Sequence, residues 1–314
     1  MDMYDPTKPY KKQIFELISK TWDTPYISVK KDIYPIFIRK IDCPEVDHTD
    51  GIGSKGEYHW QKRTFHNAVI DALAMNLNDL ALVRAIPYKM QNHIVLEKDD
   101  HKAIFKIVSE MSKECQKRNI AMTGGETSIQ KNTSGMDIGM TVSGFIKNEK
   151  PNQIQDGDVL IGFASDGLHS NGFTKVHELF GDELRDEFIM PTRIYLDEIL
   201  EIDTKYTING MMHMTGGSYT KLKDIITDVD LTIENDHKLK PQAIFSEIYE
   251  KGVADEEMYK TFNCGVGFII SVPEKEAGKI IREYPELTDI IGKAKAGKGN
   301  VFVKSYFSDK VIKY

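Results

Sequence analysis

The sequence is poor in cysteine and has no long apolar run. Three cysteines, Cys43, Cys115 and Cys264, are spread over 314 residues. An odd and scattered set of this kind predicts neither a disulfide framework nor a zinc site, and it fits a reducing compartment. No stretch reaches the apolar length of a membrane span, and the first residues lack the apolar core of a signal peptide. We therefore expect a cytoplasmic protein that does not enter a membrane.

A concentrated excess of basic residues is also missing. The chain has 41 Lys and Arg residues against 48 Asp and Glu residues, which gives a formal net charge of −7 and a pI near 5.8. A surface that binds nucleic acid needs clustered positive charge, so no nucleic-acid partner is expected. Small anionic ligands remain compatible with the sequence, held by backbone N–H groups, a metal ion and a few cationic side chains.

The length and composition predict two domains. The chain is long for one core, and its 40% hydrophobic and 28% charged content is that of a globular protein. A polar run over residues 148–157 (NEKPNQIQDG) is the clearest linker candidate, so we place one domain at residues 1–148 and another at 149–314. Helical patterns such as Phe65–Leu82 alternate with strand-like runs. This alternation predicts an α/β (α+β) fold with mixed sheets covered by helices.

The first motif that can carry chemistry is HTDGIGSK, His48–Lys55. Gly51 and Gly53 lack a Cβ atom and let backbone N–H groups approach an anion. Asp50 is suited to a hard cation, and Lys55 is suited to a phosphate oxygen. The motif has neither Walker nor GxGxxG spacing, so by itself a solvated polar turn is the simpler interpretation.

Further acidic residues follow in the same domain. Asp79 stands with Asn78 at the end of a helical pattern, and Asp71 lies eight residues earlier, so both acids can point toward a common site. A helix cap or a satisfied polar pair is the alternative. TGGET, Thr123–Thr127, follows a short strand pattern and predicts a turn. Glu126 in that turn is either a third carboxylate for magnesium or a surface side chain.

The second domain carries a candidate phosphate site. SDGLHSNGF, Ser165–Phe173, follows the strand pattern DVLIGFA and opens a helix, whose N–H groups can hold phosphate together with nearby polar side chains. A helix cap at Ser170 or Asn171 is compatible with that interpretation. HMTGGS and TFNCGVG are turns of similar character. For Cys264, a buried small residue is favoured over a nucleophile, because no His-Asn or His-Asp framework surrounds it.

In this order the motifs resemble those of the aminoimidazole ribonucleotide synthetase family, also called phosphoribosylformylglycinamidine cyclo-ligase. The matching runs are HTDGIGSK, AMNLND with Asp71, TGGET, GDVLIGFASDGLHSNGF, PTRIY, INGMMHMTGG and EMYKTFNCGVGF. They extend over most of the chain, from about His48 to Phe268. The combination of PTRIY, HMTGG and TFNCGVG is more specific than any single glycine-rich turn, and it separates this family from selenophosphate synthetase and thiamine-monophosphate kinase.

The resemblance implies a two-domain synthetase fold. Its N-terminal domain would bind ATP and metal and pair its sheets in a homodimer, and its C-terminal domain would bind substrate and phosphate, with clefts at the domain junction. It also implies a step of purine biosynthesis. ATP phosphorylates the amide oxygen of formylglycinamidine ribonucleotide, the substrate's own nitrogen attacks, and phosphate leaves as the imidazole closes. Such ring closure needs orientation and charge neutralisation, and no protein nucleophile.

Roles for individual residues follow from the resemblance, with ATP and Mg²⁺ as cofactors. The expected catalytic residues are Asp50, Lys55 and His169, and for His169 proton transfer and hydrogen bonding remain equally open. The expected metal ligands are Asp50, Asp79 and Glu126. The expected ATP-binding residues are Thr49, Gly51, Gly53, Lys55, Asp71, Asn78, Asp79, Gly124, Gly125 and Thr127. The expected substrate or phosphate contacts are His169, Ser170, Asn171, Gly172, Thr215, Gly216 and Asn263.

Two departures from the family pattern keep other functions open. Residues 28–47 contain no glycine where family members usually carry a glycine-rich flap, and Arg84 stands where glycine is expected. One alternative is a divergent ATP-dependent phosphotransferase or ligase that acts on another substrate. The other is a non-catalytic, nucleotide-binding dimeric paralogue.

Overall fold

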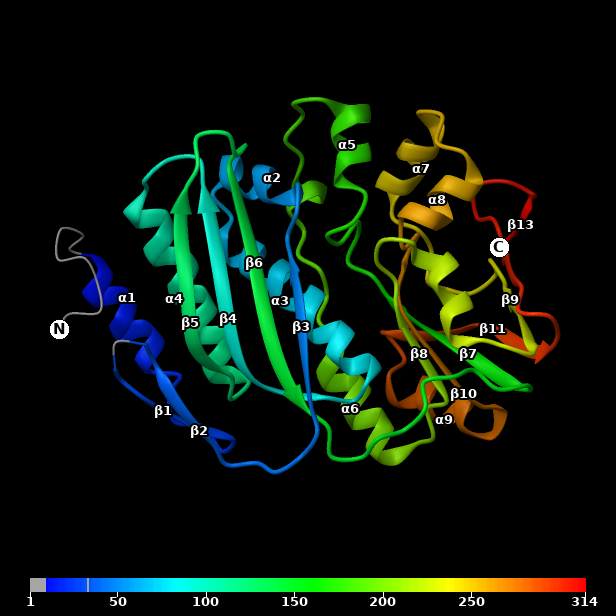
Figure 1. Cartoon of the computed structure of the whole chain (residues 1–314). Helices are drawn as coiled ribbons and strands as arrows, with labels where there is room; N and C mark the ends of the chain where they lie inside the picture. The colour runs from blue at the N-terminus through cyan, green and yellow to red at the C-terminus, as the bar shows by residue number, and fades with distance from the viewer. Residues whose placement is uncertain (1–9, 33) are drawn as a thin grey trace. The chain divides into compact units, whose positions relative to one another are not determined.

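The chain forms two compact units in the computed structural model, which describes residues 10–32 and 34–314 (Figure 1). The first unit ends at Glu149, and the second spans Lys150–Tyr314. Each unit combines a mixed β-sheet with helices, which confirms the predicted α/β class.

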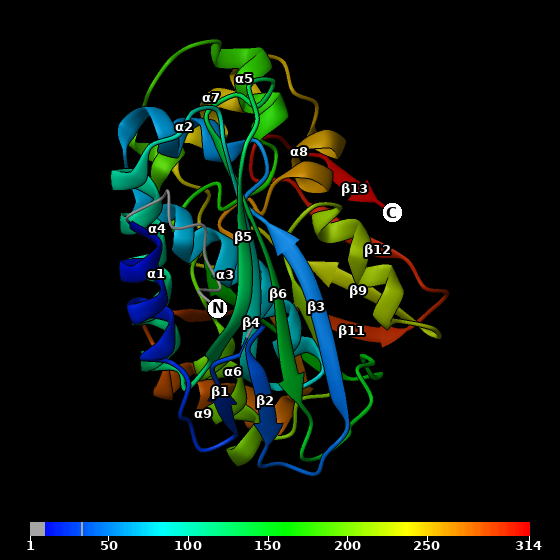
Figure 2. The ribbon, with the colours of Figure 1, turned by 60° about the vertical axis from the view of Figure 1, so that its left-hand side comes forward.

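The first unit contains a four-stranded sheet with the order β3-β6-β4-β5. The elements of this unit are α1 (Tyr10–Ser19), β1 (Ile27–Lys30), β2 (Ile36–Arg39), β3 (Glu45–Gly51), α2 (Lys55–Lys62), α3 (Phe65–Leu82), β4 (Ile86–Leu96), α4 (His101–Lys117), β5 (Ala121–Ile129) and β6 (Met136–Phe145). Strand β6 runs antiparallel to β3 and β4, whereas β4 and β5 are parallel. Helices α3 and α4 pack against one face of the sheet (Figures 1 and 2). Strands β3 and β5 are its two edges.

The sequence of the first unit explains this layering. Along β4, Met90, Ile94 and Leu96 are fully buried, while residues between them are partly or fully exposed. Alternation of this kind means that one face of the strand packs in the core while the other face is exposed to solvent. Helix α3 is apolar around most of its surface and is correspondingly buried. Helix α4 begins where it does because the Asp100 carboxylate accepts a hydrogen bond from the Ala103 N–H at 3.0 Å.

The TGGET motif is part of a strand. The predicted turn is wrong, because Thr123–Thr127 lies inside β5 and continues its parallel pairing with β4. A bulge between Met90 and Gln91 shifts the register at this point. Gly125 lies opposite Asn92, and a Cβ atom at Gly125 would crowd the Asn92 side chain. Glycine therefore permits a close approach within the sheet, where the local pattern suggested a chain reversal.

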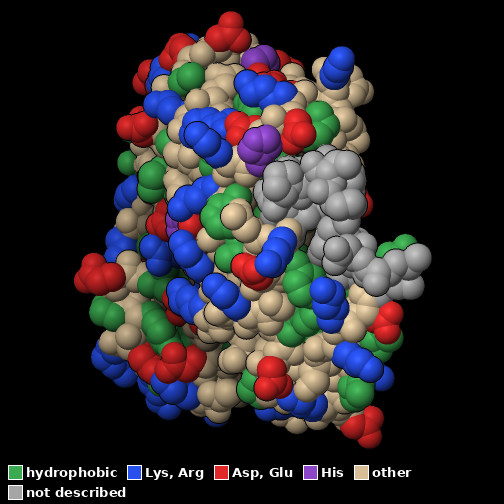
Figure 3. Space-filling model, turned by 90° about the vertical axis from the view of Figure 1, so that its left-hand side faces the viewer, with side chains coloured by type: hydrophobic (Ala, Val, Ile, Leu, Met, Phe, Trp, Pro, Cys, Tyr) green, Lys and Arg blue, Asp and Glu red, His purple; other side chains and the backbone are tan. Residues whose placement is uncertain are grey.

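Strands β1 and β2 form a separate antiparallel hairpin in the region without the expected glycine-rich flap. Ile27 anchors the hairpin by packing with Tyr88 and Phe145. All residues of β2 are exposed, including Ile36 and Ile38, which have 52% and 71% of their surface accessible. Figure 3 shows this side of the first unit, where Lys and Arg side chains are numerous and hydrophobic ones are scattered among them. The hairpin thus presents an apolar strand to solvent.

The second unit contains a seven-stranded sheet with the order β13-β12-β9-β11-β7-β10-β8. Its elements are β7 (Asp158–Ala164), α5 (Phe173–Phe180), η1 (Asp186–Ile189), α6 (Leu196–Lys205), β8 (Gly210–His213), η2 (Ser218–Ile225), β9 (Val229–Ile233), α7 (Ala243–Glu250), α8 (Asp255–Thr261), β10 (Val266–Pro273), α9 (Glu274–Glu283), β11 (Thr288–Ala296), β12 (Val301–Lys304) and β13 (Val311–Lys313). Strand β7 runs antiparallel to β10 and β11 on either side of it. The SDGLHSNGF motif follows β7, HMTGGS begins at the end of β8, PTRIY leads into α6, and TFNCGVG runs into the start of β10.

The helices and the three cysteines bear on the expectations about membranes and disulfides. In the part of the chain that is described, no helix is both long enough and apolar enough to cross a bilayer. Cys43, Cys115 and Cys264 are not in disulfides, and the last two are buried. Burial raises the pKa of the Cys264 thiol well above its usual value, which suppresses the reactive thiolate. The interpretation of Cys264 as a buried small residue is confirmed.

Candidate functional site

The HTDGIGSK motif joins the end of β3 to the start of α2. Asp50 is the second-last residue of β3, and Lys55 is the first residue of α2. The Asp50 carboxylate accepts a hydrogen bond from the Gly51 N–H at 2.7 Å. On α3, Asn76 Nδ2 donates to the Asp50 carbonyl oxygen at 3.2 Å. Helix α3 therefore fixes the position of the strand end that carries Asp50.

His48 connects the same strand to Asp79 on α3. Its Nε2 atom lies 3.1 Å from Asp79 Oδ2, and its Nδ1 atom lies 3.1 Å from Asn76 Oδ1. Asn76 Nδ2 donates to the carbonyls of Asp50 and Ala72, so the oxygen of this amide must face the imidazole. The hydrogen bond to Asp79 raises the pKa of His48. His48 was not predicted as a site residue, although it starts the motif and contacts Asp79, which was.

Lys55 and Asp71 form a buried ion pair. Both side chains are fully inaccessible, and Lys55 Nζ lies 2.9 Å from Asp71 Oδ1. The second oxygen of Asp71 lies 2.7 Å from His59 Nε2. Burial lowers the pKa values of Lys55 and His59. Asp71 contacts α2 whereas Asp79 contacts β3, and the expectation that both point toward a common site stays a prediction. Contact of Lys55 or Asp71 with ATP stays a prediction.

Within one chain, the three predicted metal ligands do not lie close enough together to bind one metal ion. Asp50 lies on β3 and Glu126 lies on β5, with β6 and β4 between them. Because neighbouring strands are about 4.8 Å apart, roughly 14 Å separates the two backbones. Among the described residues, no group of three or more His, Cys, Asp or Glu side chains is placed to hold a metal. The predicted set of Asp50, Asp79 and Glu126 is therefore not assembled within one chain, because strand order keeps Glu126 away from Asp50.

Other predicted ATP-binding residues lie on the same sheet and helix. Asn78 is fully buried in α3. Thr49 Oγ1 lies 2.9 Å from Thr141 Oγ1 on the neighbouring strand. The Thr127 N–H donates to the Glu126 carboxylate at 3.0 Å. Their role toward ATP, with that of Gly51, Gly53, Gly124 and Gly125, stays a prediction.

Arg84, two residues beyond the end of α3, has a backbone conformation that favours glycine. Its φ angle is +59°, and its N–H donates to the Ala81 carbonyl at 2.9 Å. The next N–H, of Ala85, reaches back to Leu80 at 3.0 Å. A left-handed residue just after the last helical turn is a common helix C-terminus and is usually glycine. Arg84 thus keeps the backbone role of the expected glycine, with a side chain that is buried.

In the second unit, the SDGLHSNGF loop begins at the end of β7. His169 is buried in a left-handed conformation, and its Nε2 accepts a hydrogen bond from the Asp166 N–H at 3.2 Å. Asp166 also forms a two-point ion pair with Arg193 of the PTRIY motif, at 3.1 and 2.9 Å. Ser170 Oγ lies 2.9 Å from Thr192 Oγ1. The loop and the PTRIY motif are therefore joined at two points.

Two asparagines connect this loop to the remaining motifs. Asn263 Nδ2 donates to the Gly167 carbonyl at 2.8 Å, and its Oδ1 accepts from the Gly265 N–H at 2.9 Å. Asn171 Oδ1 accepts from the Gly216 N–H at 2.9 Å. Both were predicted to contact substrate. The Asn263 amide already bonds to backbone at both ends, so it holds two turns together, and a substrate contact stays a prediction.

Close packing explains two glycines of these motifs. Gly172 caps α5 with a φ angle of +74°, and a Cβ atom there would overlap the ring of Phe262. A Cβ atom at Gly267 would overlap the Tyr195 hydroxyl and crowd His169. Glycine at these positions lets the backbones and rings of separate motifs come into direct contact.

Sequence reasoning missed several side chains that contact the motifs. Lys221 Nζ donates to the hydroxyl of buried Thr215 at 2.8 Å. Gln242 Nε2 donates to the Ser165 carbonyl at 2.7 Å. Arg193 lies within PTRIY, so its motif was noticed but its ion pair was not. Lys221 and Gln242 stand outside the quoted site residues, and only the fold brings them to the loops.

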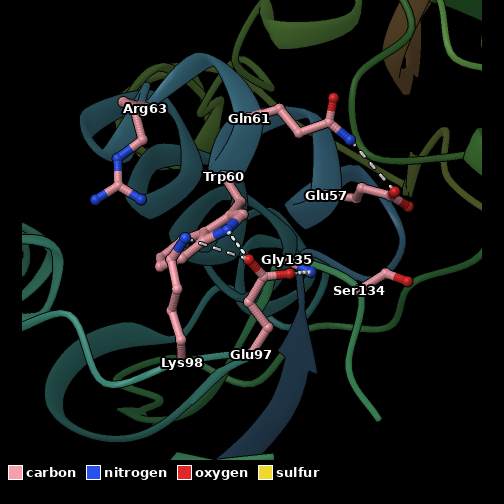
Figure 4. Close-up of a pocket in the computed structure, with 8 residues that line it drawn as sticks. All are labelled: Glu57, Trp60, Gln61, Arg63, Glu97, Lys98, Ser134 and Gly135. Carbon is pink, nitrogen blue, oxygen red and sulfur yellow. Dashed lines mark hydrogen bonds and ion pairs between the residues drawn. The ribbon is translucent and has the colours of Figure 1, made fainter. Parts of the chain in front are cut away.

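A cavity of about 380 Å³ lies elsewhere in the first unit, beside α2 (Figure 4). Its lining residues are Glu57, Trp60, Gln61, Arg63, Glu97, Lys98, Ser134 and Gly135. The Glu97 carboxylate accepts from Trp60 Nε1 at 2.8 Å and from the Gly135 N–H at 3.1 Å. The Arg63 guanidinium lies 4.4 Å from the centre of the Trp60 ring. These groups satisfy one another, and none of the predicted site residues lines the cavity.

Comparison with known families accounts for both units. Residues 43–146 match the N-terminal domain, and residues 155–304 the C-terminal domain, of "AIR synthase related protein". The chain belongs to the AIR synthase related family. The resemblance expected from the motifs is confirmed, and the matched ranges include every predicted site residue of this family member.

Relatives within the AIR synthase related family extend the similarity over nearly the whole chain. Phosphoribosylformylglycinamidine cyclo-ligase from Saccharolobus solfataricus is 32% identical over 308 residues, which cover 95% of this chain and 92% of that protein. The protein of the same name from Methanococcus vannielii is 34% identical over 252 residues, which cover 74% and 72%.

Solved structures show that the AIR synthase related fold is shared more widely. E. coli HypE superposes with a TM-score of 0.67 at 16% identity, covering 96% of both chains. Thiamine-monophosphate kinase from Stenotrophomonas maltophilia gives a TM-score of 0.65 at 16% identity, covering 96% of this chain and 98% of that one. At these identities the comparison establishes a common fold and leaves the substrate open.

Proposed function

We propose that this chain is an ATP-dependent phosphoribosylformylglycinamidine cyclo-ligase, which converts formylglycinamidine ribonucleotide to aminoimidazole ribonucleotide in purine biosynthesis. The observation that carries the proposal is the 32% identity with the Saccharolobus cyclo-ligase over 95% of this chain. The second-unit motifs also form one hydrogen-bonded group. Ser170 contacts Thr192, Asn171 contacts Gly216, and Asn263 contacts Gly167.

The proposed reaction asks for little covalent chemistry from the protein. The γ-phosphoryl group of ATP is transferred to the amide oxygen of the substrate. The substrate's own nitrogen then attacks the activated carbon, and phosphate leaves with that oxygen as the ring closes. The protein must hold the substrate in a folded conformation and neutralise phosphate charge. The burial of Cys264 agrees with a mechanism that uses no protein nucleophile.

In this proposal the first unit supplies the groups for ATP. Asp50 and Asp79 are connected through His48 and Asn76, and their carboxylates have the oxygen chemistry that Mg²⁺ prefers. When bound there, Mg²⁺ would neutralise part of the triphosphate charge. Lys55 starts α2 directly after the GIG turn, and Asp71 holds its ammonium group in place. ATP use is supported by a solved structure of HypE in complex with ATP, which has the same fold with a TM-score of 0.64.

The second unit supplies the groups for the substrate. His169, Ser170, Asn171 and Gly172 lie in one loop, and Thr215 and Gly216 lie in the turn that Asn171 contacts. His169 is proposed to donate or accept a hydrogen bond at the reacting group, and Asn263 to hold the loop in place. The buried ring of His169 and its contact with the Asp166 N–H support a fixed orientation.

We also propose a homodimer that forms through the first-unit sheets. The edge strands β3 and β5 and the exposed face that carries Gln91 and His93 support such pairing. Glu126 lies on the edge opposite Asp50, and we propose that it acts across this interface. A cytoplasmic location accords with three cysteines that form no disulfide.

The test is an assay with formylglycinamidine ribonucleotide, ATP and Mg²⁺ that follows both ADP and the diazotisable aminoimidazole. Stoichiometric formation of both products is expected. ADP without aminoimidazole would favour a divergent phosphotransferase or ligase. Nucleotide binding without ADP formation, in the presence of the correct substrate, would favour a non-catalytic paralogue.

A further inference from the structure

We propose that Lys221 binds the phosphate monoester of the substrate, an inference that rests on the proposed function. Lys221 lies in η2, three residues beyond the HMTGGS turn, and its Nζ donates to Thr215 Oγ1 at 2.8 Å. Thr215 is buried, whereas the next residue, Gly216, is exposed. The ammonium group is therefore attached to the turn that also contacts the SDGLHSNGF loop.

The charge of Lys221 is not neutralised by a carboxylate. Several lysines of this unit form ion pairs, such as Lys150 with Asp203 at 2.8 Å and Lys205 with Glu201 at 2.7 Å. Within the described residues, Lys221 has no such partner, and its Nζ donates to the Thr215 hydroxyl. An ammonium group has three N–H donors, and Thr215 uses one. A partly buried cation with donors to spare is suited to an anionic ligand.

A second donor contacts the same turn. Asn171 Oδ1 accepts from the Gly216 N–H, which orients the amide. The Asn171 Nδ2 atom is buried and has no acceptor among the described residues. A buried donor without an acceptor is unfavourable, and native structures usually provide one. An anion at the Gly216 turn would supply acceptor oxygens for this amide and for Lys221.

Phosphate is the anion that fits the proposed reaction. A phosphate monoester carries close to two negative charges near neutral pH and offers several acceptor oxygens. The substrate has one such group, and the triphosphate of ATP is the other source of phosphate oxygens. The carboxylates and glycine turn proposed for ATP lie in the first unit, so we assign Lys221 to the monoester. The two sources differ in which Michaelis constant responds to a change at Lys221.

Steady-state kinetics of Lys221→Met test this assignment. Loss of one charge-assisted contact is expected to raise KM for formylglycinamidine ribonucleotide about tenfold or more, while kcat and KM for ATP stay within about twofold. Lys223→Met is the matched control, because Lys223 lies in the same element and is exposed. Lys221→Arg keeps the charge and should recover part of the loss. An unchanged KM for the ribonucleotide, or a rise confined to ATP, would overturn the assignment.

Binding of ribose 5-phosphate separates this inference from the proposed function. Calorimetry should detect binding to the wild-type protein that weakens about tenfold in Lys221→Met and is unchanged in Lys223→Met. Equal binding by all three proteins, or none by the wild type, would refute the phosphate site. If Lys221-dependent binding occurs but no aminoimidazole forms, the site stands and the proposed function falls. Lys221→Gln replaces the Met variant if the latter does not fold.

Discussion

His48 Nε2 lies 3.1 Å from Asp79 Oδ2, and its other ring nitrogen faces the amide oxygen of Asn76. The orientation of that amide is fixed because its nitrogen donates to two backbone carbonyls. Both imidazole nitrogens thus face acceptors, an arrangement that a doubly protonated ring satisfies best. When its ring is doubly protonated, His48 places a positive charge on strand β3 beside the carboxylates proposed to bind Mg²⁺.

Replacing Asp79 should lower the pKa of His48. The hydrogen bond to Asp79 raises this pKa in the folded protein. The pair therefore stabilises the fold fully below the unfolded pKa of about 6.5, and the contribution is lost as pH rises through the folded value. In Asp79→Asn, NMR titration should show a lower His48 pKa, and the loss of stability should be larger near pH 6 than in alkaline buffer. Asp99→Asn is the control, because Asp99 is exposed. If the His48 pKa in Asp79→Asn equalled that in this control, the expectation would be contradicted.

Removing the charge of Asp71 should destabilise the first unit strongly. Asp71→Asn leaves the Lys55 ammonium buried without a counter-charge, and breaking a buried pair in this way costs about 3 kcal/mol or more. Urea unfolding measures the loss. The double variant Lys55→Met with Asp71→Leu removes both charges and should recover most of the stability. A loss below about 1 kcal/mol in Asp71→Asn would show that the pair is solvated in solution.

Alanine at Gly172 should cost more stability than alanine at Gly157. Both glycines have positive φ angles, of +74° and +81°, so each change carries a backbone penalty of about 1 kcal/mol. Only at Gly172 would the new Cβ overlap a ring, that of Phe262, whereas Gly157 faces open space. An additional loss of about 1–3 kcal/mol is expected for Gly172→Ala. Equal unfolding free energies for the two variants would mean that the loop and the ring are not packed as described.

Arg84→Gly should be more stable than Arg84→Ala by about 1 kcal/mol. Both variants lose the same side-chain contacts, so their difference isolates the left-handed backbone at φ of +59°. Comparing the two by denaturant unfolding avoids any assumption about the Arg84 side chain. Identical stabilities would indicate that this position is not left-handed in solution.

Helix positions could be predicted from sequence because they depend on local periodicity. The pattern over Phe65–Leu82 coincides with α3. The turn predicted at TGGET was wrong. Paired glycines usually mark a turn, but here they lie in β5 and leave room for the side chains of the neighbouring strand β4. A local sequence pattern does not reveal that neighbour. The structure that a residue type favours depends on its neighbours in the tertiary fold.

The sequence predicted which residue types the candidate site contains, but it did not predict which of those residues contact one another. Asp50 and Glu126 have the right chemistry for a metal, but strand order places them on opposite edges of one sheet. Lys55 and Asp71 are sixteen positions apart, and spacing alone does not show that they neutralise each other in the core. His48 and Lys221 were missed because their importance lies in contacts with other parts of the fold.

The exposed β2 strand has a consequence for handling the protein in solution. Ile36 and Ile38 lie on a strand that has a free edge, and such edges favour pairing between chains. Lys30 and Lys31, at the end of β1, are exposed beside it and repel the same hairpin of another molecule. Because salt screens charges at exposed positions, these two lysines act as gatekeepers whose protection against aggregation weakens as ionic strength rises.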